Sequence, residues 1–192
     1  MKRLAWLWIS VLLLGTVTAS TAAAEPLKIR YSIWVGYGPL FIAKEKGYFK
    51  EEQVEVDLVN IEDPKEGFFA LAAGRLDGVV STIDTMVLYL KKGNEYQYVL
   101  ALDDSAGGDG IVARKEIQSI KDLKGKKIAV NEGSVSQFFL NVVLKENGMT
   151  QKDVNIVNMK QGDAGAAFVA EKVDAAVTWE PWLSKGKAAP HG

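Results

Sequence analysis

Residues 30–47 read RYSIWVGYGPLFIAKEKG, and the rest of the chain is organised around this stretch. Residues 30–35 alternate and are rich in aromatic and β-branched side chains, as in a strand. Gly36, Gly38 and Pro39 interrupt that pattern, and residues 40–43 resume with helical spacing. Pro39 suits the first helical turn, where its missing N–H costs nothing. The stretch therefore predicts a strand, a loop and a helix.

A loop of this kind is a place where a small ligand can bind. The first N–H groups of the helix have no partner within the helix, and Trp34 and Tyr37 stand beside them. The alternative is an ordinary turn in which Gly36 and Gly38 serve backbone geometry alone. The rest of the chain has to separate these two interpretations.

The composition argues against several chemistries. The chain has 192 residues, a formal net charge of −1, no cysteine and one histidine, His191. Disulfides, thiolate nucleophiles and cysteine-bound zinc are excluded, and a lone histidine argues against a Ser-His-Asp triad. The charge gives no electrostatic footprint for nucleic acid. Neither a phosphate-binding GxxxxGK[ST] loop nor a dinucleotide-binding GxGxxG loop occurs. We therefore expect no catalytic residues, no metal and no cofactor, and not an enzyme.

The amino terminus predicts a signal peptide over residues 1–24. Lys2 and Arg3 precede an apolar run at residues 4–17, and an A-x-A site ends at Ala24. A retained membrane anchor is the alternative, but the run is shorter than the roughly 20 apolar residues that a spanning helix needs. We expect cleavage after Ala24 and a periplasmic mature protein.

The chain repeats a strand and helix pattern after about one hundred residues. Residues 28–31 correspond to 127–130, residues 43–47 to 144–148, and residues 69–80 to 168–177. Each half therefore reads β-α-β-α-β, with mainly parallel strands. This predicts an α/β fold with a first lobe at 25–110, a hinge crossing at 111–118 and a second lobe at 119–192. A strand is also expected at 97–102. The alternative is one larger doubly wound sheet.

Loops at the carboxyl ends of parallel strands line the binding crevice in such sheets. Here these loops are residues 34–39, 81–85, 103–110, 131–136, 160–164 and 178–182. Ser134 and Ser136 could hold an anionic or carbonyl oxygen, or Ser134 could simply cap the helix that follows. The loops carry Asp84, Asp109, Asp163 and Glu180, no arginine and one lysine, Lys160. This balance favours a ligand with amino, amidine or urea-like donors over an inorganic anion.

Aromatic side chains at these loops favour an organic ligand. Trp34, Tyr37, Trp179 and Trp182 stand at the predicted mouths of the strands, where aromatic walls suit organic or cationic groups. Packing in the core is the alternative for each ring, and we expect it for one or two of them.

Four stretches of this sequence resemble the nitrate/sulfonate/taurine-type periplasmic substrate-binding proteins of ABC importers. They are residues 36–52 (GYGPLFIAKEKGYFKEE), 71–79 (LAAGRLDGV), 122–130 (DLKGKKIAV) and 173–181 (VDAAVTWEP). The resemblance covers residues 27–185. It implies a two-lobed type II periplasmic-binding-protein fold, a small-molecule ligand held between the lobes, and an ABC permease as the partner at the membrane. We expect a monomer.

The resemblance also implies where the ligand binds. The matching positions are Trp34, Gly36, Tyr37, Gly38, Thr82, Asp84, Thr85, Asp109, Gly133, Ser134, Ser136, Trp179 and Glu180. Members of this family continue beyond the length of this chain, so we expect the second lobe to be incomplete and the C-terminal part of the fold to be missing. Two other interpretations stay open: an enzyme on the same fold, related to thiamine-pyrimidine synthesis, and a periplasmic sensor or interaction domain.

Overall fold

The computed structural model describes residues 25–91 and 95–192, so the predicted signal peptide lies outside the described residues. The first lobe contains strands β1 (Leu27–Tyr31), β2 (Val56–Asn60) and β3 (Gly78–Val79). Its helices are α1 (Gly38–Lys46), α2 (Tyr48–Glu51), α3 (Pro64–Ala72) and α4 (Ile83–Tyr89), with a 3-10 turn at Val35–Tyr37. The strands form a parallel sheet in the order β2-β1-β3.

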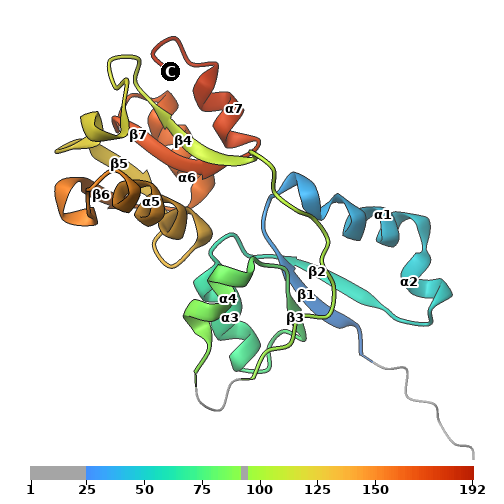
Figure 1. Cartoon of the computed structure of the whole chain (residues 1–192). Helices are drawn as coiled ribbons and strands as arrows, with labels where there is room; N and C mark the ends of the chain where they lie inside the picture. The colour runs from blue at the N-terminus through green and yellow to red at the C-terminus, as the bar shows by residue number, and fades with distance from the viewer. Residues whose placement is uncertain (1–24, 92–94) are drawn as a thin grey trace, which may run out of the picture.

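The second lobe contains strands β4 (Asp109–Ala113), β5 (Lys127–Val130), β6 (Asn155–Asn158) and β7 (Ala175–Trp179). Its helices are α5 (Val135–Glu146), α6 (Gln161–Val169) and α7 (Trp182–Lys187), and 3-10 turns occupy Ile120–Leu123 and Gln151–Asp153. The sheet order is β4-β7-β5-β6, and only β4 is antiparallel to its neighbour. Figure 1 shows the two lobes as separate layered units.

The internal repeat is present in the topology. The order β2-β1-β3 in the first sheet corresponds to β6-β5-β7 in the second, and each pair of strands is parallel. The prediction of two mainly parallel sheets flanked by helices is confirmed, and the alternative of one larger sheet is wrong.

Local sequence explains where the helices begin and end. Asp63 caps α3 by accepting a hydrogen bond from the Lys65 N–H, and Pro64 occupies the first helical position. Ser134 caps α5 in the same way, by accepting from the Ser136 N–H. Gly47 ends α1 with a φ of 80°, a left-handed conformation that glycine adopts without strain. These residues set where α3 and α5 begin and where α1 ends.

The second sheet is the middle of a three-layer sandwich. Ile128 and Val130 of β5 pack with Leu140 and Leu144 of α5 on one face. Alternate strand positions point to the opposite face, where Ala129 joins a cluster with α6 and α7 that includes Phe168 and Leu183 in its core. Both clusters of buried side chains in the described part of the chain belong to this lobe.

The structure corrects the predicted boundary between the lobes. Residues 111–118 are not the crossing, because Asp109–Ala113 forms β4 and pairs with β7 of the second sheet. The crossing lies earlier, at residues 95–108. The second sheet therefore has four strands, against the three counted from sequence. The strand expected at 97–102 is absent: this segment has no strand assignment and pairs with no strand of the described residues.

Candidate functional site

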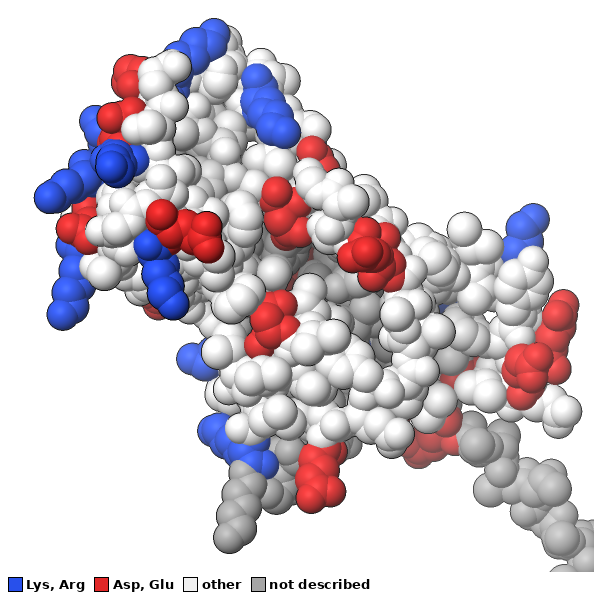
Figure 2. All heavy atoms as spheres, in the orientation of Figure 1, with Lys and Arg blue, Asp and Glu red and all other residues white. Residues whose placement is uncertain are grey.

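A cleft of about 1440 Å³ opens between the lobes and extends along the first sheet. The residues predicted from sequence that line it come from both lobes: Trp34, Tyr37, Thr82, Thr85, Asp109, Ser134 and Trp179. Carboxyl ends of β1, β3, β5 and β7 thus meet at one place, as expected for parallel strands. Figure 2 shows acidic side chains gathered around the hollow between the lobes, while the basic ones lie mostly on the outer parts.

Trp34 attaches the crossing segment to the first lobe. Its indole Nε1 donates to the Asp103 carboxylate at 2.8 Å, and its ring packs against Gly108. Gly36 lies so close to Asp103 and Trp34 that a side chain there would collide with both. The glycine therefore permits the close approach of the crossing segment to this loop. Asp103 lines the cleft as well, although sequence did not single it out as a site residue.

Tyr37 and Asp109 are both partly buried in the lining of the cleft. Burial raises the pKa of Tyr37 to about 12, with further contributions from nearby Tyr98, Asp103 and Asp109 and an opposing one from Arg30. Burial and the neighbouring Asp84 also raise the pKa of the Asp109 carboxyl, which the hydrogen bond from Ser105 Oγ at 2.7 Å partly opposes. Asp103 and Asp109 therefore line the same cleft, and Asp84 lies near enough to Asp109 to raise the pKa of its carboxyl.

Arg30 lies beneath the cleft, although sequence placed no arginine at the loop mouths. It belongs to β1 and is 2% exposed. Its guanidinium donates to the carbonyl oxygens of Ile61 at 2.6 Å, Glu62 at 2.8 Å and Val80 at 2.9 Å. Because these carbonyls follow β2 and β3, Arg30 ties together the ends of the strands that support the cleft.

The second lobe presents the amino terminus of α5 to the cleft. Ser134 Oγ donates to the Asn131 carbonyl at 2.7 Å and accepts from the Ser136 N–H and from Gln161 Nε2, each at 3.2 Å. A hydroxyl has one proton and two lone pairs, so this oxygen is saturated and serves as a cap. The remaining N–H groups of the first turn of α5 are the donors that this lobe offers to a ligand.

The other predicted residues stand outside the lining of the cleft: Gly36, Gly38, Asp84, Gly133, Ser136 and Glu180. Gly38 is the first residue of α1. Ser136 is 3% exposed, and its hydroxyl has no partner among the described residues. Both carboxylate oxygens of Glu180 accept hydrogen bonds from Ser184 at the start of α7. Glu180 is thus a cap of that helix.

The two tryptophans at the end of β7 differ in their surroundings. Trp179 lines the cleft, and its indole Nε1 donates across the lobes to the Ile33 carbonyl at 2.8 Å. Trp182 packs against Gly162 and Gly165 of α6, with Lys185 Nζ at 4.2 Å from its ring centroid. Trp182 is therefore a packing residue, one of the outcomes expected from sequence.

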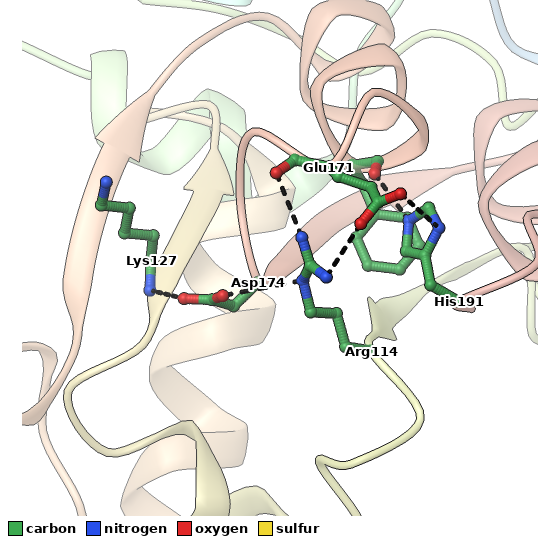
Figure 3. Close-up of polar contacts among 6 residues, drawn as sticks. Arg114, Lys127, Glu171, Asp174 and His191 are labelled. Carbon is green, nitrogen blue, oxygen red and sulfur yellow. Dashed lines mark hydrogen bonds and ion pairs between the residues drawn. The ribbon is translucent and has the colours of Figure 1, made fainter.

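His191 lies at the other end of β7 from the cleft. Its Nε2 is 2.9 Å from the Phe168 carbonyl, and its Nδ1 is 4.0 Å from Glu171. Arg114 joins this group through Glu171 and Asp174, as Figure 3 shows.

In the part of the chain that the structure describes, no group of three or more acidic, histidine or cysteine side chains could hold a metal ion. No helix of that part is long and apolar enough to cross a membrane.

Comparison with known proteins places this geometry in a family. The chain is 32% identical over 176 residues to a Bacillus subtilis (strain 168) protein named for aliphatic sulfonate binding, covering 88% of this chain and 53% of that protein. It is 28% identical over 148 residues to a 4-amino-5-hydroxymethyl-2-methylpyrimidine phosphate synthase of Aspergillus parasiticus, covering 75% and 42%.

A solved structure has the same fold. The alkanesulfonate-binding protein of Xanthomonas axonopodis pv. citri bound to MOPS aligns with a TM-score of 0.64 and 25% identity, over 84% of this chain and 57% of that one. This chain thus spans about half the length of the relatives it matches. The NMT1/THI5-like family profile matches residues 34–187. The chain therefore belongs to the NMT1/THI5-like family.

Proposed function

We propose that the chain is a periplasmic solute-binding component of an ABC importer, which captures a small polar organic molecule between its lobes and delivers it to a membrane permease. The observation that carries this proposal is the meeting of loops from both sheets at one cleft. Family membership and the two relatives named for sulfonate binding support it. Type II clamps of this kind hold a ligand by closing on it.

The charges of the cleft favour a ligand that carries hydrogen-bond donors. Asp103 and Asp109 line the cleft, and Asp84 lies close enough to Asp109 to repel it. A bare anion would be repelled there, whereas an amino, amidine or urea-like group would pair with the carboxylates. The amino terminus of α5 suits the opposite end of such a molecule, an anionic or carbonyl oxygen. An aminoalkanesulfonate has both a nitrogen donor for the carboxylates and an anionic oxygen for the start of α5. A simple alkanesulfonate has only the anionic oxygen.

Thermal shift of the chain with a panel of compounds tests this function. The panel contains an alkanesulfonate, an aminoalkanesulfonate, an amidine, a urea, a pyrimidine, nitrate and sulfate. A ligand of the folded chain raises the melting temperature by mass action. We expect compounds with nitrogen donors to stabilise the chain and the inorganic anions to leave it unchanged. Strong stabilisation by nitrate or sulfate alone would contradict the proposed ligand class.

A pair of aspartate variants locates the binding. Asp109→Asn removes a charge from the cleft, and we expect it to weaken an amine-bearing ligand about tenfold, as for the loss of one charge-assisted hydrogen bond. Asp57→Asn is the matched control, because Asp57 is exposed on β2 and lies outside the lining of the cleft. Equal affinities for the two variants would place the ligand elsewhere.

An enzyme related to thiamine-pyrimidine synthesis is the second candidate, supported by the similarity to the pyrimidine phosphate synthase. His191, the one histidine of the chain, contacts Phe168 and Glu171 at the far end of β7 and cannot reach a ligand in the cleft. Turnover of a pyrimidine precursor by the chain would favour this second candidate, while binding without turnover favours the solute-binding protein.

A further inference from the structure

Tyr89 reaches from the first lobe to a cleft loop of the second. It is the last residue of α4, and its hydroxyl donates to the Gly133 carbonyl at 2.9 Å. Its ring stacks on Phe68 with 5.0 Å between centroids and meets the edge of Phe69 at 6.2 Å. Phe68 is 2% exposed. The hydroxyl is therefore held in place by the packing of the first lobe.

Glycine is the only residue type that can stand at position 133 and receive this contact without strain. Its φ is +76°, and a Cβ at this position would lie 2.5 Å from the Tyr89 hydroxyl oxygen. Its N–H donates to Gln137 Oε1 at 2.8 Å, which ties the loop to α5. Ser134, the next residue, caps α5 and lines the cleft. Tyr89 thus fixes the peptide that precedes this wall of the cleft.

Few other contacts set the orientation of the lobes. In the described residues the chain passes between the sheets once, through residues 95–108. Trp179 Nε1 donates to the Ile33 carbonyl, and Lys160 Nζ lies 3.9 Å from Glu66 across the cleft rim. The Lys160–Glu66 side chains are 44% and 61% exposed, and such surface pairs contribute little. With one covalent crossing in the described residues, the part-buried hydrogen bonds from Tyr89 and Trp179 are the side-chain contacts best placed to hold the lobes together.

We propose that Tyr89 is a positioning residue, which holds the two lobes in the arrangement seen in this structure and fixes the 131–136 loop without contacting the ligand. Tyr89 lies outside the lining of the cleft. The proposal rests on the proposed function, since it treats the cleft as the binding site. Its measurable consequence is independent of any ligand: loss of the hydroxyl shifts the chain from this arrangement of the lobes toward other arrangements.

Distances between two spin labels test this, and the chain is suited to them because it has no cysteine. Glu51→Cys on α2 and Lys145→Cys on α5 place one label on an exposed site of each lobe. Without ligand, we expect Tyr89→Phe to lower the population of this arrangement relative to others about two- to tenfold, the effect of one hydrogen bond, and so to broaden the distribution of distances between the labels. Tyr48→Phe is the control, because Tyr48 is 51% exposed on α2.

Unchanged distances in Tyr89→Phe would overturn the proposal. A glycine pair gives a second measurement that leaves Tyr89 in place. Gly133→Ala pushes against the tyrosine hydroxyl and should broaden the distances, whereas Gly125→Ala, with φ of +72° and open space around the Cβ, should not. Equal melting temperatures for Tyr89→Phe and Tyr48→Phe show that the fold is intact. If no compound in the panel binds but Tyr89→Phe still broadens the distances between the labels, the proposed function fails and the role of Tyr89 in holding the lobes stands.

Discussion

At the scale of single residues, Asp109 links the cleft to the pH dependence of stability. It begins β4 opposite Trp179 and lies close to Asp84. Burial and that neighbour raise the pKa of its carboxyl, so the folded chain holds this proton more tightly than the unfolded chain does. The resulting stability is fully present below the ordinary value of 3.8 and is lost as pH rises through the folded-state pKa.

Asp109→Asn should therefore be more stable than the parent at neutral pH. The amide carries no charge to desolvate, and its oxygen can still accept the hydrogen bond from Ser105. The advantage should shrink as pH falls and disappear near 3.8, where the parent carboxyl is also protonated. Free energies of unfolding in urea, at neutral pH and near pH 3.8, measure this advantage, with Asp57→Asn as the exposed control. A gain of the same size at both pH values would show that the cause is not ionisation.

The sequence identifies some of these residues and misses others for a physical reason. Trp34 and Tyr37 are recognised because a glycine-rich loop follows a strand, which is a local pattern. Asp103 as a residue of the cleft and Tyr89 as a contact between the lobes are both missed, because their hydrogen bonds join positions 69 and 44 residues apart. No local spacing encodes such a pairing. The hydroxyl of Ser134 is a different case. From sequence it could cap the helix or bind a ligand, and only its hydrogen-bond partners in the structure distinguish these two roles.

At the scale of elements, the strands that alternate in sequence are present, and the error lies in the crossing segment. Residues 97–102 (QYVLAL) have the composition of a strand, yet strand propensity is realised only against a neighbouring strand. Val99 and Leu100 are 88% and 67% exposed there. Residues 109–113 are the reverse case: they were assigned to the end of the first lobe and the start of the crossing, and pairing with β7 makes them a strand of the second sheet.

The start of α5 offers a matched pair of serine variants. Ser134→Ala removes the cap and leaves Gln161 Nε2 without its acceptor, so it should destabilise the chain by about 1 to 2 kcal/mol. Ser136→Ala removes a buried hydroxyl that has no partner among the described residues, so it should be neutral or stabilising. Urea unfolding of both variants at neutral pH measures the difference. Equal losses would mean that the Ser136 hydroxyl has a partner of comparable strength.

At the scale of the whole molecule, the internal repeat reveals two lobes of like topology but conceals how differently they are packed. In the structure, Ile128 of β5 is fully buried, whereas Ile29, the equivalent residue of β1 in the repeat, is only partly buried. The difference arises from what covers each sheet, since α5 packs on one face of the second and α6 and α7 on the other.

This asymmetry predicts that the two lobes unfold locally at different rates. Local opening is favoured where few apolar contacts must be broken, so amides of β1 and β2 should exchange with deuterium at least about tenfold faster than those of β5 and β7. Hydrogen exchange measured by mass spectrometry resolves these segments. Leu140 lies on the core-facing side of α5, and Leu140→Ala should bring the exchange rates of the two lobes closer together. Val142 is 40% exposed on the same helix, and Val142→Ala should not have this effect. Equal protection of both sheets in the parent would show that the lobes unfold as one cooperative unit, and that contacts such as Tyr89 to Gly133 couple them more strongly than their cores differ.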